Sequence, residues 1–220
     1  MRKKILVRGP CLTRSGYGEH ARFVIRSLRT REDIFDIYII PVNWGQTGWL
    51  AIDDDERRWY DEKIKATAIY NQHGGQFDIS LQVTIPNEWE QLAPVNIGVT
   101  AGIEATKVAP VRLEKANMMD KIITISEHSK WGFENTKYQG QNPQTGDPIT
   151  LVCEKPVEVV HYPVKIYETL PELELGLDFD FNFLAVAQVG PRKNMENTIK
   201  WFIEENIDQE VGLVLKAHIK

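Results

Sequence analysis

The stretch ILVRGPCLTRSGYGEHARFVIRSL, residues 5–28, decides the fold predicted for this chain. Its first three residues form an apolar run of strand size, which Gly9 and Pro10 end. The turn at residues 15–18 reads Ser-Gly-Tyr-Gly, and beyond it the apolar positions 21, 24, 25 and 28 recur with helical spacing. The sequence therefore predicts a buried strand, a glycine-bearing turn and an amphipathic helix.

The same turn is the first candidate binding site. Glycines just before a helix let a ligand approach the backbone closely, and the first helical amides and the helix dipole favour an anion such as phosphate. A plain loop between a strand and a helix is the alternative. Because the turn opens a series of alternating strands and helices, we interpret Gly16, Tyr17 and Gly18 as a phosphate-binding candidate.

Strands and helices alternate through the next 130 or so residues. Asp53-Asp54-Asp55 opens one predicted helix, with Tyr60, Ile64 and Ala68 on its inner face. Strict alternation indicates parallel βαβ units, and hence a Rossmann-like α/β fold with an open parallel sheet covered on both faces. The further predicted strands cover residues 35–42, 77–85, 95–103, 121–126 and 157–161, and a polar break at 139–148 is closed as a hairpin by a strand at 149–155.

The pattern restarts after an acidic, leucine-bearing segment. We predict a first domain over residues 1–164, a linker over 165–180, and one further β-α-β unit over 181–220. A single such unit cannot bury both faces of a sheet, so the sequence predicts an incomplete second Rossmann-like domain in a chain that is a fragment or a truncated product. Apolar side chains left exposed there would favour self-association; the predicted ones are Phe183, Val186, Leu213 and Leu215.

Composition excludes several classes of protein. A formal net charge of −5, with no tract rich in lysine or arginine, argues against a general nucleic-acid binder. The apolar runs have strand length, so no transmembrane segment is predicted, and the run after Lys4 is too short for a signal peptide. Cys11 and Cys153 lack metal-site spacing and cannot make a disulfide framework. We predict reduced thiols in a cytoplasmic protein without a bound metal.

Several segments together resemble a known family. SGYGEHARFVIRSL, NIGVTAGIEAT, MMDKIITISEHSK, VEVVHYPV and FLAVAQVGPRKNMENTIKWF occur in the order found in retaining glycosyltransferases of the GT-B architecture, the family 4-like group 1 enzymes. The resemblance implies two Rossmann-like domains facing a cleft. The amino-terminal domain would hold a glycosyl acceptor and the carboxy-terminal domain a UDP- or GDP-linked sugar, transferred with retention and without a metal.

The resemblance also implies roles for particular residues. Gly16 and Gly18 match the glycine loop that reaches toward the donor phosphates, and Arg192 and Lys193 match a basic pair after the second domain's first strand. Fixed cations there would stabilise the negative charge that grows on the leaving nucleotide. The family's pair is commonly several residues apart, so Lys193 is the better match. A solvated turn is the alternative for both residues.

Other features depart from the family. Many relatives carry a histidine at the end of the fourth strand, where this chain reads Thr100-Ala101-Gly102. Glu104 follows, as a candidate for orienting a sugar hydroxyl or assisting the acceptor, or simply as a surface acid. The family's paired-glutamate motif would fall beyond Lys220. The alternative function is therefore a non-catalytic module that binds a sugar or a phosphorylated metabolite, or that binds a partner protein.

Three more residues are candidates on the acceptor side. Asn87 and Glu88 follow the third predicted strand, at the sheet edge where open α/β sheets bind ligands. His128 stands at the start of a predicted helix. Asp53 and Asp55 form an Asp-x-Asp, but because they open a helix we interpret them as part of its cap rather than as metal ligands. The dinucleotide fingerprint fails for want of a third glycine, and no nucleophile elbow or Walker lysine is present.

Overall fold

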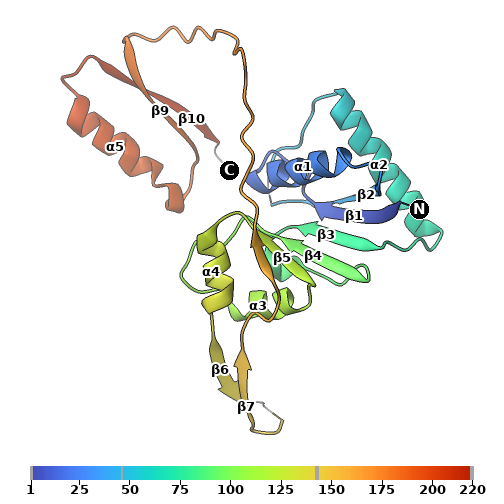
Figure 1. The fold of residues 1–220 in the computed structure, drawn as a ribbon. Helices are drawn as coiled ribbons and strands as arrows, with labels where there is room; N and C mark the ends of the chain where they lie inside the picture. Colours follow the sequence, from blue (N-terminus) through green and yellow to red (C-terminus); the bar gives the residue numbers. More distant parts are fainter. Residues whose placement is uncertain (1, 46, 142–143, 219–220) are drawn as a thin grey trace. The chain divides into compact units, whose positions relative to one another are not determined.

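The computed structural model describes residues 2–45, 47–141 and 144–218 (Figure 1). Contacts between residues divide the chain into two compact units, Met1–Val164 and Lys165–Lys220. The two units are described separately below.

The first unit is built on a six-stranded sheet whose strand pairs are all parallel, which confirms the predicted fold class. The strand order is β2-β1-β3-β4-β5-β8, so β1 lies inside the sheet between β2 and β3. The strands are β1 (Lys3–Gly9), β2 (Phe35–Pro41), β3 (Ile79–Val83), β4 (Val95–Val99), β5 (Lys121–Thr124) and β8 (Val157–Val159). The helices are α1 (Gly16–Arg29), α2 (Asp55–Gln72), α3 (Pro110–Asn117) and α4 (Glu127–Asn135), with a 3₁₀ turn η1 (Pro86–Glu88).

The sheet separates two apolar clusters. Because side chains alternate along a strand, Ile5 and Val7 point to one face, where they pack with Ile25 of α1 and Tyr60 of α2. The other face carries Trp89 and the inner residues of α3 and α4. That second cluster contains Trp89, Leu113, Ala116, Met119, Ile122, Phe133 and Val157, each at most 5% exposed. Burial of these two clusters is the main stabilising contribution to the first unit.

Helix α2 begins as the sequence predicts, and Tyr60 and Ile64 pack against the core as predicted. The Asp54 carboxylate accepts a hydrogen bond from Arg57 N, so Asp54 caps the helix. The prediction for Ala68 is wrong, because Ala68 is exposed and Thr67 is buried in its place. The Thr67 hydroxyl accepts a hydrogen bond from Ile39 N at 2.8 Å and donates one to Lys63 O. It thus satisfies a backbone amide on the outer side of the edge strand β2, which explains why a threonine is turned inward.

The polar break folds into a hairpin that extends from the end of α4 (Figure 1). Strand β6 (Tyr138–Gln141) pairs with β7 (Pro148–Leu151) in antiparallel register. The predicted hairpin is therefore present, but its first arm uses polar residues assigned from the sequence to the break, and its second arm ends at Leu151. Residues 142 and 143 of the break lie outside the described part of the chain.

The second unit contains one β-α-β element after a segment, 165–180, without helix or strand. Strands β9 (Phe181–Gln188) and β10 (Val211–His218) are parallel, and α5 (Met195–Asn206) connects them after the turn η2 (Pro191–Lys193). Phe183 packs against Phe202 of α5. Phe183, Val186 and Leu215 are exposed, as predicted, whereas Leu213 is half-buried.

Candidate functional site

The carboxyl ends of β1, β3, β4 and β5 lie at one edge of the first unit's sheet. In open parallel sheets this edge is where ligands bind. Gly16–Gly18 follow β1, Asn87 and Glu88 follow β3, Glu104 follows β4, and His128 follows β5. The predicted candidates of the first unit thus leave the sheet at the same edge, and hydrogen bonds decide which of them meet.

The loop between β1 and α1 is fixed by its own polar side chains. The Ser15 hydroxyl caps α1 by accepting a hydrogen bond from Gly18 N at 2.9 Å. Thr13 Oγ1 donates to Pro10 O and lies 2.8 Å from the Ser15 hydroxyl oxygen. Arg22, in the second turn of the helix, donates from Nη1 to Cys11 O and Thr13 O, both at 2.9 Å. Hydrogen bonds within the chain therefore fix the path of the loop into α1.

The two glycines of the turn have different surroundings. A Cβ on Gly16 would meet no atom within 4 Å, so this position is open. A Cβ on Gly18 would lie 2.2 Å from Thr13 O, and no side chain fits there. Packing alone explains the glycine at position 18. Only Gly16 leaves space for a ligand beside the backbone, and its contact with phosphate stays a prediction.

Tyr17 connects the start of α1 to the end of β4. Its hydroxyl lies 2.9 Å from Thr100 Oγ1 and accepts a hydrogen bond from Ala101 N at 3.2 Å. Its ring packs on Trp44, with ring centroids 4.5 Å apart. Burial raises the pKa of Tyr17, and the hydrogen bonds with Thr100 and Ala101 oppose the rise. Tyr17 is therefore an uncharged phenol at neutral pH.

Charged groups of η1 and α3 act on the same tyrosine. The charge of Arg112 lowers the pKa of Tyr17 and that of Glu88 raises it, each less than burial does. Helix α3, which carries Arg112, packs against η1, which carries Glu88. Arg8 fixes η1 in place by donating to Glu88 O at 2.9 Å. The charges of Glu88 and Arg112 thus act on Tyr17 from two elements that pack together, while the Asn87 side chain is exposed.

Glu104 and His128 lie on neighbouring parts of the same edge. Glu104 is exposed in the turn after β4, and His128 is exposed in the first turn of α4. The turn is tied to the helix because Ile103 N donates to the Ser129 hydroxyl at 3.0 Å. Gly102 has a φ of +114°, which L-residues with side chains rarely adopt. The roles predicted for Glu104 and His128 stay predictions.

Arg192 and Lys193 lie in the second unit. Both belong to η2 and are exposed, and Lys193 N donates to Gly190 O at 3.0 Å. Asn194 follows in the left-handed conformation, with φ at 49°, and leads into α5. The pair therefore forms the turn predicted from the sequence. Its predicted meeting with a donor diphosphate stays a prediction.

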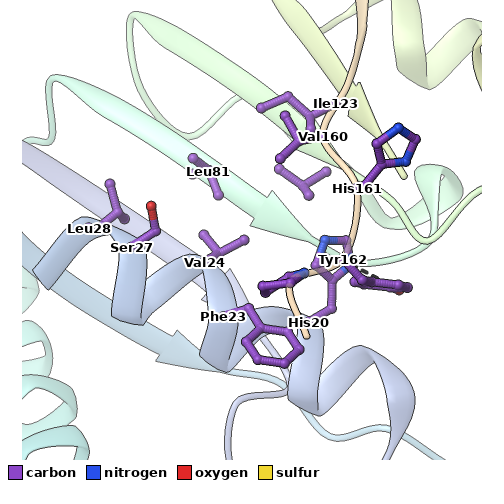
Figure 2. A pocket seen from close by; sticks show the side chains of 12 residues that line it. His20, Phe23, Val24, Ser27, Leu28, Leu81, Ile123, Val160, His161 and Tyr162 are labelled. Atoms are coloured by element: carbon purple, nitrogen blue, oxygen red, sulfur yellow. Dashed lines mark hydrogen bonds between the residues drawn. The ribbon is translucent and has the colours of Figure 1, made fainter. Parts of the chain in front are cut away.

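An apolar cavity of about 420 Å³ opens beside the same edge of the first unit (Figure 2). Its floor is the sheet face formed by Leu81, Val99 and Ile123, one wall is α1, and the other is the segment after β8. His20 and Tyr162 lie at one end, with ring centroids 4.7 Å apart. Tyr162 Oη and His20 Nδ1 are 3.4 Å apart. Nothing in the sequence pattern pointed to this cavity.

No known protein family, curated protein or solved structure matches this chain. The fold class is therefore assigned from the parallel sheet alone. Any function must be proposed from the residues at the edge of that sheet. In the described ranges, no group of three or more His, Cys, Asp or Glu side chains is arranged to hold a metal ion. None of the helices described here is long and apolar enough to cross a bilayer.

Two residues of this region escaped the sequence prediction. Arg112 stands in the first turn of α3, where the helix dipole disfavours a cation, and that misfit is a signal that could have marked it. Thr100 reads as one more residue of a buried strand, and its bond with Tyr17 joins positions 83 residues apart. No local pattern could reveal that contact.

Burial makes His20 a source of acid sensitivity. Burial lowers the pKa of His20 from 6.5 to about 4, so the folded chain holds this ring neutral while the unfolded chain protonates it. Stability from this source is present above pH 6.5 and is lost as the pH falls toward 4. Over that window the loss is about 3 kcal/mol, at roughly 1.4 kcal/mol per pH unit. Urea unfolding of the wild type and of His20→Leu at pH 7 and pH 4.5 measures this loss of unfolding free energy.

The comparison between the two proteins isolates this residue, because carboxylates elsewhere titrate equally in both. We expect the wild type to lose more stability than His20→Leu on acidification, by about 2–3 kcal/mol. Equal losses in the two proteins would show that the ring is solvated in the folded state.

Proposed function

We propose that this chain is a glycosyltransferase, or part of one, that transfers a sugar from a UDP- or GDP-linked donor to an acceptor with retention. The observation that carries the proposal is the pair of hydrogen bonds that Tyr17 makes with Thr100 and Ala101, which brings the start of α1 to the end of β4. The charges of Glu88 and Arg112 act on the same tyrosine. Gly16 is open at the same place. The order of the segments that resemble retaining GT-B glycosyltransferases supports it.

Each part has a physical role in the proposed reaction. The open space beside the Gly16 backbone and the dipole of α1 would favour a donor phosphate. Lys193, with Arg192, would stabilise the charge that grows on the nucleotide as the glycosidic bond breaks. Asn87, Glu88 and His128 would contact the acceptor, and Glu104 would orient a sugar hydroxyl. The reaction requires no metal, and a cytoplasmic location agrees with the free thiols Cys11 and Cys153.

A non-catalytic binding module is the second candidate function. Thr100, Ala101 and Gly102 supply no acid or base where many relatives have a histidine, and Glu104 is exposed. Such a module would bind a sugar or a phosphorylated metabolite at the same sheet edge. The exposed apolar residues of β9 would favour self-association of the chain whichever of the two functions it has.

The two candidates separate in one experiment. The ¹⁵N-labelled chain is titrated with UDP-glucose and GDP-mannose while release of UDP or GDP is followed in the same samples. A glycosyltransferase predicts shifts of the Gly16–Gly18 amides together with slow nucleotide release, in which water takes the sugar in place of the acceptor. Shifts without release favour the binding module over a chain that is catalytically complete. Amides at Gly16–Gly18 that respond to neither nucleotide-sugar, with no release, would contradict the proposal.

Replacement of Lys193 tests the basic turn. Lys193→Ala should weaken donor binding and lower turnover by tenfold to somewhat over a hundredfold, because one charge-assisted contact is worth roughly 1.5–3 kcal/mol. The effect should shrink as salt is added. Lys200→Ala is the matched control, since Lys200 is an exposed lysine of the same unit that pairs with Glu204 on α5. Equal donor affinity and turnover in both variants would make η2 a solvated turn.

A further inference from the structure

The cavity beside α1 is apolar along most of its length. Val24 and Leu28 of α1 face Leu81, Val99 and Ile123 of the sheet across it, and Val160 closes the far wall (Figure 2). Leu81 and Val99 are at most 8% exposed, so the floor is a continuous part of the core. The proposed roles of Gly16, Tyr17 and Glu88 use none of these residues.

Most of the polar side chains of the cavity gather toward one end, whereas Ser27 lies beside Leu28. His20 and Tyr162 meet at that end, and His161 lies beside them with its Nδ1 2.9 Å from Ile125 O. Among the described residues that line the cavity, none is a lysine, arginine, aspartate or glutamate. His20 is neutral at pH 7 because burial lowers its pKa to about 4. A charged ligand would therefore lose hydration without gaining a partner of opposite charge.

This polar end adjoins the candidate site. His20 stands one helical turn after Tyr17, and the two ring centroids are 6.4 Å apart. A molecule with its apolar part between α1 and the sheet would therefore direct its other end toward the edge where Tyr17 meets Thr100. The volume of about 420 Å³ lies in the range of small-molecule sites.

We propose that the cavity binds the apolar part of an uncharged amphiphile, an alkyl chain or a small ring system that carries a hydroxyl-rich head. The inference rests on the proposed function, because it makes this amphiphile the glycosyl acceptor. The apolar part of the amphiphile lies along Val24, Leu81 and Ile123. Its hydroxyl-rich head reaches past His20 and Tyr162 to the sheet edge. Apolar contact supplies the affinity and the polar end orients the head.

Methyl NMR measures binding without donor. The protein, labelled at Ile, Leu and Val methyl groups, is titrated with n-octyl β-D-glucopyranoside below its micelle concentration. We expect saturable shifts of Val24, Leu81 and Val99, no shifts there with methyl β-D-glucopyranoside, and at least fivefold weaker binding of octanoate. Shifts that do not saturate, or that appear equally at Leu184 and Val186 of β9, would mean nonspecific association with exposed apolar surface and would overturn the proposal.

A pair of matched variants locates the site. Val160 lines the cavity and is 57% exposed, so Val160→Trp fills the cavity without disturbing a packed position. Val111 on α3 is 47% exposed and does not line it. Val160→Trp should weaken octyl glucoside binding at least tenfold, and Val111→Trp should change it less than twofold. Equal affinities in the two variants would place the ligand elsewhere.

Turnover distinguishes this inference from the proposed function. The two glycosides serve as acceptors with UDP-glucose or GDP-mannose. We expect a higher kcat/KM for the octyl glycoside, with the preference lost in Val160→Trp. Equal transfer to both glycosides, without shifts of the cavity methyls, would support glycosyl transfer and overturn the cavity proposal. Saturable binding in the cavity with no transfer to either glycoside would support the cavity proposal and overturn the proposed glycosyl transfer.

Discussion

Gly18→Ala is expected to reduce the free energy of unfolding by about 3 kcal/mol or more. The added Cβ would lie 2.2 Å from Thr13 O and 2.8 Å from Thr13 Oγ1, and the first of these is a backbone atom that cannot rotate away. Either the β1–α1 loop or the first turn of α1 must shift. A shift would also break the bond from Gly18 N to the Ser15 hydroxyl. The usual advantage of alanine in a helix, about 1 kcal/mol, is too small to compensate.

Gly16→Ala provides the matched control in the same helical turn. Its Cβ would meet nothing within 4 Å, so we expect stability to stay equal or to rise by up to about 1 kcal/mol. Urea unfolding followed by circular dichroism measures both variants. Equal losses at the two positions would mean that the turn is not packed as described. If Gly16 is a phosphate contact, Gly16→Ala should weaken nucleotide-sugar binding while leaving stability intact.

Arg22→Met is expected to cost about 3 kcal/mol, the second large effect on the same loop. The Arg22 side chain is only 7% exposed and its Nη1 is bonded to Cys11 O and Thr13 O. Methionine fills similar space but leaves both carbonyl oxygens without this donor. Glu19, whose side chain is 41% exposed, also loses a partner, but solvent reduces the cost of that loss. Hydrogen exchange of the loop amides should accelerate along with global destabilisation.

Arg58→Met is the control for this substitution. Arg58 pairs with Asp53 and Asp55 at the start of α2, and its side chain is 59% exposed. Removal of such a surface pair should change stability by no more than about 0.5–1 kcal/mol. A cost for Arg22→Met as small as this would show that water replaces the guanidinium in the loop.

Much of the fold could be predicted because the parallel strands are short apolar runs, most of which are followed by a helix. The strand at residues 5–7 and the stripe of Ala21, Val24 and Ile25 needed only local patterns. The prediction that Ala68 faces the sheet was wrong for a physical reason. Its neighbour Thr67 is polar, and only the edge position of β2 explains why a hydroxyl is buried beside the Ile39 amide. Such pairings depend on strand order, which periodicity does not contain.

The candidate site could be predicted in outline but not in detail. Gly16, Tyr17 and Glu88 could be selected as candidates because they follow the carboxyl ends of strands, where open α/β sheets bind ligands. The sequence did not distinguish the open Gly16 from the packed Gly18, since that difference arises from the path of the preceding loop. The cavity was missed because its walls come from α1, three strands and the segment after β8. Each contributes residues that look like ordinary core.

The inner position of β1 has a consequence for biosynthesis. Ile5 pairs with Ile37 on one side and with Ile79 on the other, so β1 is synthesised before β3, the strand that encloses it. At roughly 5–20 residues per second, that delay lasts several seconds. During it, an apolar strand and the apolar stripe of α1 have only local partners. We expect nascent chains from which β3 has not yet emerged to be bound by chaperones, and release to follow the emergence of β3.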